Sequence, residues 1–65
     1  MNVFINQQPT ELPEPASVQD ALAALAPTPP FAVAVNTVFV PRAQYTAHLL
    51  QDGDRVEVIA PVTGG

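Results

Sequence analysis

The residues of this chain with the clearest potential for chemistry are its last four, Val62-Thr63-Gly64-Gly65. Two of the three glycines of the sequence are its last two residues. Because Gly has no Cβ, a Gly-Gly end has no side chain to bury and can thread a channel too narrow for any other residue. The sequence therefore predicts a free tail over 62–65 that could carry its carboxylate into another protein. A frayed end that happens to be Gly-Gly is the alternative interpretation.

The charge balance points to a protein partner rather than to nucleic acid. Six carboxylates stand against Arg42 and Arg55, and the net charge is −4, which argues against binding to a phosphate backbone. A basic protein surface is a more suitable partner. The sequence contains no lysine, so no ε-amine of the same chain could intercept an activated terminal carboxylate. A compositional accident in so short a chain is the plainer explanation of that absence.

The remaining polar side chains favour structural roles. His48 is the only histidine and the sequence has no cysteine, so we expect it to be solvated or to cap a helix rather than to bind a metal. Asp52 and Asp54 fit a turn better than a calcium loop. Arg42 is a candidate for partner recognition, with a solvated arginine as the alternative. No catalytic residue, metal site or phosphate-cradling pattern is expected.

Length and composition predict one small domain. A chain of 65 residues is near the lower limit for folding alone, because such a domain buries only about 60% of the surface that its unfolded chain exposes. The absence of cysteine excludes disulfides and indicates no oxidising compartment. The amino terminus lacks a basic region, and no apolar run is long enough to span a membrane. We expect a cytoplasmic protein without a membrane segment.

The amino-terminal third predicts a hairpin and a helix. A first strand over 1–5 has its alternate apolar residues on one face, the turn covers 6–9, and a short strand returns over 10–12. Ser17 and Asp20 form a capping-box pattern at the start of a helix over 18–26. The apolar stripe of this helix contains Val18, Ala21, Leu22 and Leu25.

The rest of the chain predicts three more strands. Residues 31–35 and 38–40 form a second hairpin around a tight turn at Asn36-Thr37. A short helical turn and an extended crossing are expected over 42–51, followed by a turn at Asp52-Gly53-Asp54. The last strand, 55–60, places Val56 and Val58 on one face and Glu57 and Ile59 on the other.

These elements predict an α+β fold with four or five strands and one helix across one face of a mixed sheet. The connection between the first and last strands is long enough for them to pair in parallel at the centre of the sheet. The order β-β-α-β-β-β fits the ubiquitin-like β-grasp. The expected division is a β-grasp domain over 1–61 and a diglycine tail over 62–65.

Along its whole length the chain resembles the ThiS family, the small β-grasp sulfur carrier proteins of thiamine biosynthesis. The resemblance is carried by Ala34-Val35-Asn36, by Val40-Pro41-Arg42 with Tyr45 three residues on, by Asp52-Gly53-Asp54 with Val56-Glu57, and by Gly64-Gly65. The departures are Thr37, where the family often has a more turn-prone residue, Tyr45, where tryptophan is common, and Thr63 before the diglycine.

The resemblance implies a protein co-substrate rather than an enzyme. A ubiquitin-activating-like enzyme of the ThiF type would adenylate the Gly65 carboxylate with ATP, and sulfur would then replace the AMP to give a thiocarboxylate. A thiazole synthase of the ThiG type would receive that sulfur for thiazole formation. Gly65 would carry the covalent modification, while Gly64, Thr63 and Val62 would give access to the partner's active site. No bound cofactor is implied, since the ATP belongs to the activating partner.

Three other functions stay open at this point. The small subunit of molybdopterin synthase shares the fold and the Gly-Gly end, but it is usually somewhat longer and lacks the Val-Pro-Arg pattern. A protein modifier joined to lysines through Gly65 would differ only in what attacks the activated terminus. A binding module of β-grasp type with an inert tail would need no activation at all.

Overall fold

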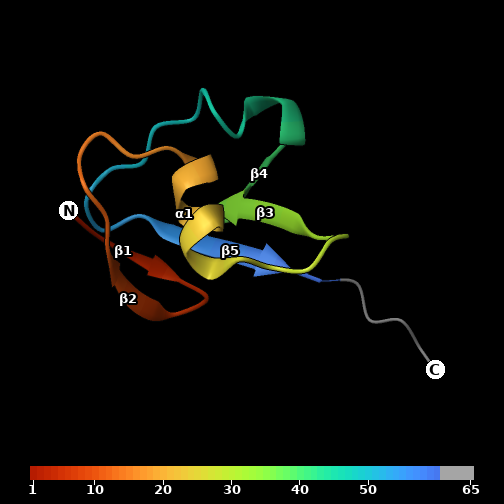
Figure 1. The fold of residues 1–65 in the computed structure, drawn as a ribbon, viewed down its shortest axis with the longest axis horizontal. Helices are drawn as coiled ribbons and strands as arrows, with labels where there is room; N and C mark the ends of the chain where they lie inside the picture. Colours follow the sequence, from red (N-terminus) through yellow and green to blue (C-terminus); the bar gives the residue numbers. More distant parts are fainter. Residues whose placement is uncertain (61–65) are drawn as a thin grey trace.

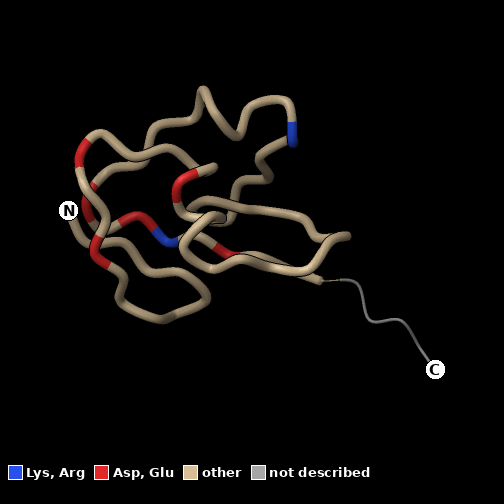
Figure 2. Tube along the Cα trace, viewed as in Figure 1, with Lys and Arg blue, Asp and Glu red and all other residues tan. Residues whose placement is uncertain are grey.

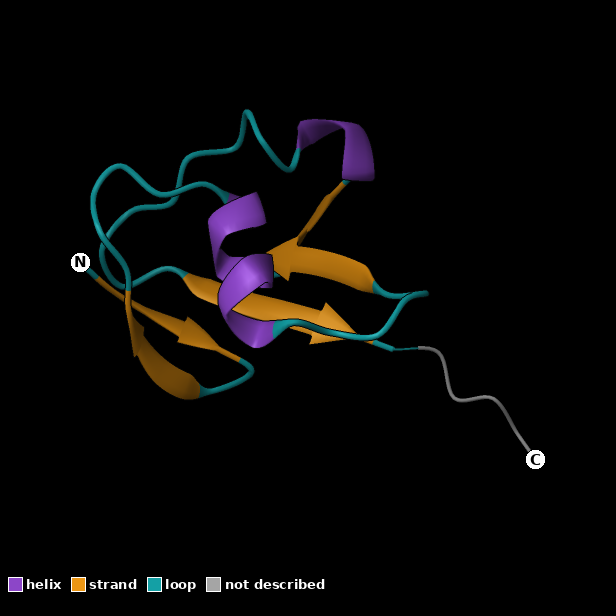
Figure 3. Ribbon diagram, in the orientation of Figure 1, coloured by secondary structure: helices purple, strands orange, loops and turns teal. Residues whose placement is uncertain are grey.

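A computed structural model describes residues 1–60, in which a five-stranded sheet carries one α-helix across one face (Figures 1 and 3). The elements are β1 (Asn2–Ile5), β2 (Gln8–Glu11), α1 (Val18–Leu25), β3 (Ala32–Val35), β4 (Val38–Val40), the short 3-10 helix η1 (Arg42–Gln44) and β5 (Arg55–Ile59). The strand order is β2-β1-β5-β3-β4, with β1 and β5 parallel and the other neighbours antiparallel. This arrangement confirms the predicted ubiquitin-like β-grasp.

Both hairpins turn through two residues with positive φ. Asn6 and Gln7 have φ of 50° and 70°, and Asn36 and Thr37 have the same two values. Positive φ at both central residues is the pattern of a type I′ turn, which matches the twist of the flanking strands. The predicted turn over 6–9 was therefore too long, because Pro9 lies within β2. An edge strand tolerates proline, since one row of its backbone groups has no strand to pair with.

The helix begins at the predicted capping box. The Ser17 N–H donates to the Asp20 carboxylate at 2.8 Å, and the Asp20 N–H donates to the Ser17 hydroxyl at 3.3 Å, so two backbone donors of the first turn are satisfied. Val18, Ala21 and Leu22 are buried as expected, but Leu25 is 38% exposed. The stripe prediction was wrong at this residue because Leu25 lies in the last helical turn, beside the loop of the first hairpin.

The core lies between α1 and the inner face of the sheet. The buried strand residues alternate as the sequence predicted, and the loops close the ends of this layer; the buried apolar set outside the helix is Val3, Ile5, Leu12, Ala16, Val33, Val35, Val40, Tyr45, Leu50 and Val56. In β5, Val56 is buried and Val58 half-buried, whereas Glu57 and Ile59 are exposed on the outer face. Within residues 1–60, one face of the sheet is thus packed against the helix and the other is not covered by one.

The turn before β5 also has the predicted chemistry. Gly53 has a φ of 87°, a region that L side chains rarely adopt. The Asp52 carboxylate accepts from the Asn2 N–H at 2.7 Å, and the Asp54 carboxylate accepts from the Gln51 N–H at 2.8 Å. The first bond joins the turn to the start of β1, and the second closes the turn itself. Among residues 1–60, no helix is long and apolar enough to cross a membrane.

Candidate functional site

The predicted reactive residues Val62, Thr63, Gly64 and Gly65 lie outside the described residues, so the predicted freedom of the tail stays a prediction. The described part of the site is the strand that leads to them. β5 is the middle strand of the sheet, with β1 on one side and β3 on the other. The approach to the carboxyl terminus is therefore built from a strand that has a paired neighbour on each side.

Asparagine side chains from both hairpin turns bond to the backbone of β5. The Asn6 side-chain oxygen accepts from the Val58 N–H at 2.8 Å, and the Asn36 side-chain oxygen accepts from the Arg55 N–H at 3.0 Å. The backbone N–H of Asn36 also donates to the Arg55 carbonyl at 2.8 Å. The two ends of β5 are each held by one turn, one from either side of the strand.

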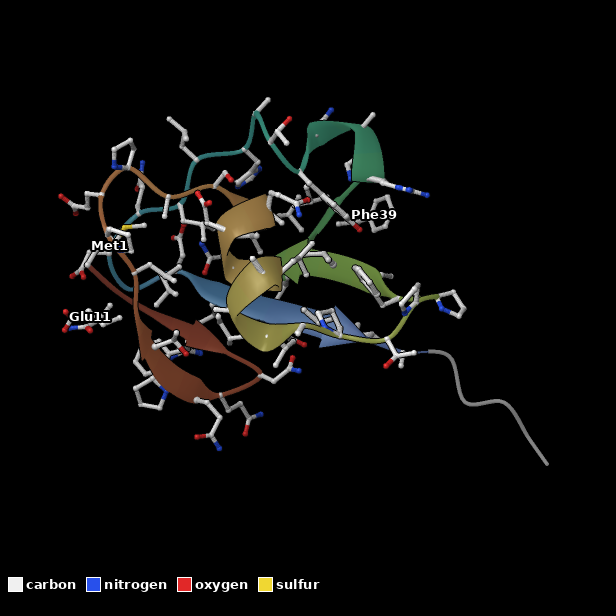
Figure 4. The ribbon with its side chains drawn as sticks, in the orientation of Figure 1. Met1, Glu11 and Phe39 are labelled. Atoms are coloured by element: carbon white, nitrogen blue, oxygen red, sulfur yellow. The ribbon has the colours of Figure 1, made fainter. Side chains whose placement is uncertain are left out.

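The outer face of the sheet exposes large apolar side chains on β1, β4 and β5. Ile59 is 55% exposed. Phe39, labelled in Figure 4, lies on the edge strand β4 and is 64% exposed. Phe4 lies on the same face, because its backbone pairs with Arg55 in register with the outward residues of β5. Arg55 and Glu57 supply charge within this outer face. The outward residues of the five strands are Asn2, Phe4, Pro9, Glu11, Ala32, Ala34, Phe39, Arg55, Glu57 and Ile59. Exposed apolar side chains with charged side chains among them are typical of a surface that binds another protein.

A second surface feature lies near Arg42. A groove of about 530 Å³ runs between the C-terminal end of α1, the proline-rich loop and η1. Phe31 and Tyr45 stack in it with their ring centroids 6.5 Å apart and an interplanar angle of 11°. Arg42 is exposed and lines the same groove. Arg42 lies on η1, which follows the edge strand β4. In Figures 1 and 2 this segment lies away from the C-terminal end of β5, so the fold does not bring Arg42 together with the approach to the tail.

The other polar residues singled out in the sequence have structural surroundings. His48 is half-buried, and its backbone carbonyl accepts from the Val18 N–H at 2.9 Å at the start of α1. Asp52 and Asp54 serve the turn, as predicted. Within residues 1–60 there is no group of three or more His, Asp or Glu side chains that could hold a metal ion.

Sequence reasoning missed the two asparagines that hold β5. It assigned Asn6 and Asn36 to turns, which the structure confirms, but gave their side chains no partner. The available signal was that an asparagine opens each hairpin turn, since Asn tolerates positive φ and keeps a side-chain acceptor free. The apolar outer face could also have been predicted, because Phe4, Phe39 and Ile59 alternate along their strands with the residues of the buried face.

Comparisons with known proteins give a consistent result. The sequence profile of the ThiS family matches residues 3–65. The crystal structure of the thiamine biosynthesis protein ThiS from Geobacter metallireducens superimposes with a TM-score of 0.82 at 29% sequence identity, covering 100% of both chains. A solution structure of a thiamine biosynthesis protein from the same organism gives a TM-score of 0.78 at 29% identity, covering 100% of this chain and 88% of that one. The comparison with curated protein sequences found no match.

Proposed function

Since this chain belongs to the ThiS family, we propose that it is a sulfur carrier protein of thiamine biosynthesis. The observation that supports this most strongly is the family match, which extends from residue 3 through the terminal Gly64-Gly65. The likeness of the whole fold to a thiamine biosynthesis protein is a second support. In this proposal the protein is a co-substrate, and the catalytic groups belong to its partners.

The proposed chemistry takes place at the Gly65 carboxylate. A carboxylate is a poor electrophile because its negative charge repels nucleophiles. A carboxylate oxygen attacks the α-phosphate of ATP on a ThiF-type activating enzyme, pyrophosphate leaves, and a mixed anhydride with AMP forms. A hydrosulfide ion, HS⁻, then attacks the carbonyl carbon, AMP leaves and the S–H proton is lost, so that the terminus becomes a thiocarboxylate. A ThiG-type thiazole synthase takes this sulfur.

Gly64 and Thr63 serve access in this proposal. The adenylating site must hold the carboxylate within attacking distance of a phosphate, and a glycine next to the terminus presents no Cβ to the wall of the channel. Val62 and Thr63, the two residues before the diglycine, give it access to that site together with Gly64. ATP is consumed by the activating partner, and the carrier itself needs no bound cofactor.

The outer face of the sheet is the proposed contact surface for these partners. An enzyme that receives the tail must also cover the surface from which the tail leaves, and Ile59 on that surface is the penultimate described residue. Phe4, Phe39 and Ile59 offer apolar area, and Arg55 and Glu57 offer charge for orientation. Arg42 was the sequence-based candidate for partner binding. Because it lies on η1 and not on the outer face of the sheet, we assign it no part in the main contact with the partner.

The decisive experiment is the intact mass of the protein recovered from its own cells. Exchange of one terminal oxygen for sulfur supports the carrier proposal. A ladder of conjugates with other proteins would instead support a modifier joined through Gly65. Recovery of only the unmodified chain, from cells that are making thiamine, would contradict both functions and leave a binding module with an inert tail.

A further inference from the structure

The last strand extends beyond the end of its parallel neighbour. β1 pairs with β5 at two positions, the second being Ile5 opposite Val56, whereas β3 pairs with β5 as far as Ile59. On the β1 side, the Asn6 N–H donates to the Val56 carbonyl at 2.9 Å. The next backbone donor of β5 on this side is the N–H of Val58, and β1 has ended before it can offer an acceptor.

The side chain of Asn6 supplies the missing acceptor. Its oxygen accepts from the Val58 N–H at 2.8 Å, across 52 positions of sequence. In an uninterrupted parallel ladder the acceptor would be a backbone carbonyl of the neighbouring strand. Asn6 has already left the strand conformation, with a φ of 50°, so its side-chain amide takes the place of that carbonyl. The ladder on this side of β5 is thereby extended by one bond toward the carboxyl terminus.

We infer that Asn6 is a positioning residue for the reactive carboxyl terminus, an inference that rests on the proposed function. Val58 is held by Asn6 on one side and lies opposite Val33 of β3 on the other. Gly65 is seven residues beyond Val58. A strand end bonded on both sides leaves the sheet in a fixed direction, so the tail starts its path into a partner's channel from a defined point. Without the Asn6 bond, that end must be ordered again each time a partner docks.

Asn36 provides a matched comparison within the same molecule. It opens the second hairpin turn with the same φ of 50°, and its side-chain oxygen accepts from the Arg55 N–H at 3.0 Å. Its side-chain amide also donates to Asp54 at 3.0 Å. Loss of the Asn36 side chain therefore removes more hydrogen bonds than loss of the Asn6 side chain, but it removes them at the start of β5, away from the tail.

Glycine and aspartate are the informative substitutions. Gly is favourable at positive φ in a type I′ turn, so Asn6→Gly keeps the hairpin and removes only the side-chain acceptor. Asn6→Asp keeps an acceptor oxygen at the same place and still tolerates positive φ. Asn36→Gly makes the same chemical change as Asn6→Gly at the other end of the strand.

The experiment combines two measurements on the full chain and these three variants. Amide hydrogen exchange reports the opening of the Val58 and Ile59 N–H groups in the free protein. ATP–pyrophosphate exchange with the cognate activating enzyme gives kcat and KM for the carrier. We expect Asn6→Gly to speed exchange at Val58 and to lower kcat/KM by about two- to tenfold, the worth of one hydrogen bond. The loss should appear in KM, because the docked complex reacts as before.

Asn36→Gly should leave KM unchanged, and Asn6→Asp should restore most of kcat/KM. A wild-type KM for Asn6→Gly, or an equal loss in Asn36→Gly, would overturn the inference, since either result would mean that docking of the carboxyl terminus does not depend on Asn6 in particular. Failure of the proposed function has a different signature: the unaltered chain would then support no pyrophosphate exchange. In that case the positioning role falls with the proposed function, whereas protection at Val58 in Asn6→Gly still shows whether the Asn6 bond holds the end of β5.

Discussion

The side-chain amide of Asn36 donates to the carboxylate of Asp54 at 3.0 Å and so joins the turn of the second hairpin to the turn before β5. The other oxygen of the same carboxylate accepts from the Gln51 N–H at 2.8 Å. One aspartate therefore closes its own turn and also connects it to a turn 18 residues earlier. The start of β5 is fixed by polar groups from two turns, in addition to the apolar packing of its inner face.

Replacing Thr37 by glycine should stabilise the protein. Thr37 is β-branched and has a φ of 70°, a conformation that costs a non-glycine residue about 1–2 kcal/mol. Glycine removes this cost, but part of the stabilisation is lost because Gly has more conformational freedom in the unfolded chain. The net gain in stability should be about 1 kcal/mol. Denaturant unfolding measures the difference, and Gln7→Gly, at the same φ in the first hairpin, is the unbranched comparison. A less stable Thr37→Gly would show that the threonine side chain makes a stabilising contact.

The Leu22→Ala variant should be destabilised by about 2–5 kcal/mol. Leu22 is 5% exposed, in the middle of the helix face that covers the sheet, and its truncation leaves a cavity there. In a domain this small the loss could unfold the chain at room temperature. A thermal melt is the measurement, with Leu25→Ala as the control because that side chain is 38% exposed and should cost less. Equal melting temperatures for the two variants would mean that the helix presents another face to the core.

The Phe39→Ala variant should bind the activating enzyme more weakly while its stability is nearly unchanged. Phe39 is 64% exposed on the outer face, so its removal costs little folding energy, but a buried aromatic contact at an interface is commonly worth more than 1 kcal/mol. Val38 is equally exposed on the same strand, at a position of opposite orientation, and Val38→Ala is the matched control. Isothermal titration measures both affinities. A larger loss for Val38→Ala would place the contact surface elsewhere.

Deletion of Gly65 should abolish activation and leave the fold intact. The deletion withdraws the carboxylate by up to about 3.6 Å. A misplacement of about 1 Å can already cost on the order of a hundredfold in rate. The stability change should stay within about 0.5 kcal/mol, as for other featureless surface changes. ATP–pyrophosphate exchange and a thermal melt on the same sample test both parts.

A Gly64→Trp variant complements that deletion, because it keeps the chain length and adds only bulk. It should melt like the unaltered protein and fail in pyrophosphate exchange, since Gly alone presents no Cβ to a channel wall. Full exchange activity in the Gly65 deletion would refute the carrier proposal. Full activity in Gly64→Trp alone would refute the narrow-channel argument and leave the activation chemistry in place.

The local pattern of the sequence was enough to place the helix and most of the strands. The capping box of Ser17 and Asp20, the positive-φ turn at Asn36-Thr37 and the turn around Gly53 all lie where the sequence predicted them. Each depends on side chains within a few residues of the backbone groups that they satisfy. Leu25 was misassigned because helical periodicity does not report where a helix passes the edge of the sheet beneath it.

The order of the elements, the alternating core of the strands and the diglycine terminus could all be predicted from local sequence patterns. Tertiary structure alone decided what surrounds β5. Asn6 reaches Val58 across 52 positions, and Phe4, Phe39 and Ile59 share one face only because β1, β3 and β4 pair in one particular register. No periodicity encodes such pairings, because they are selected by the burial of the whole inner face at once, and a shift of one residue would turn every outward side chain inward.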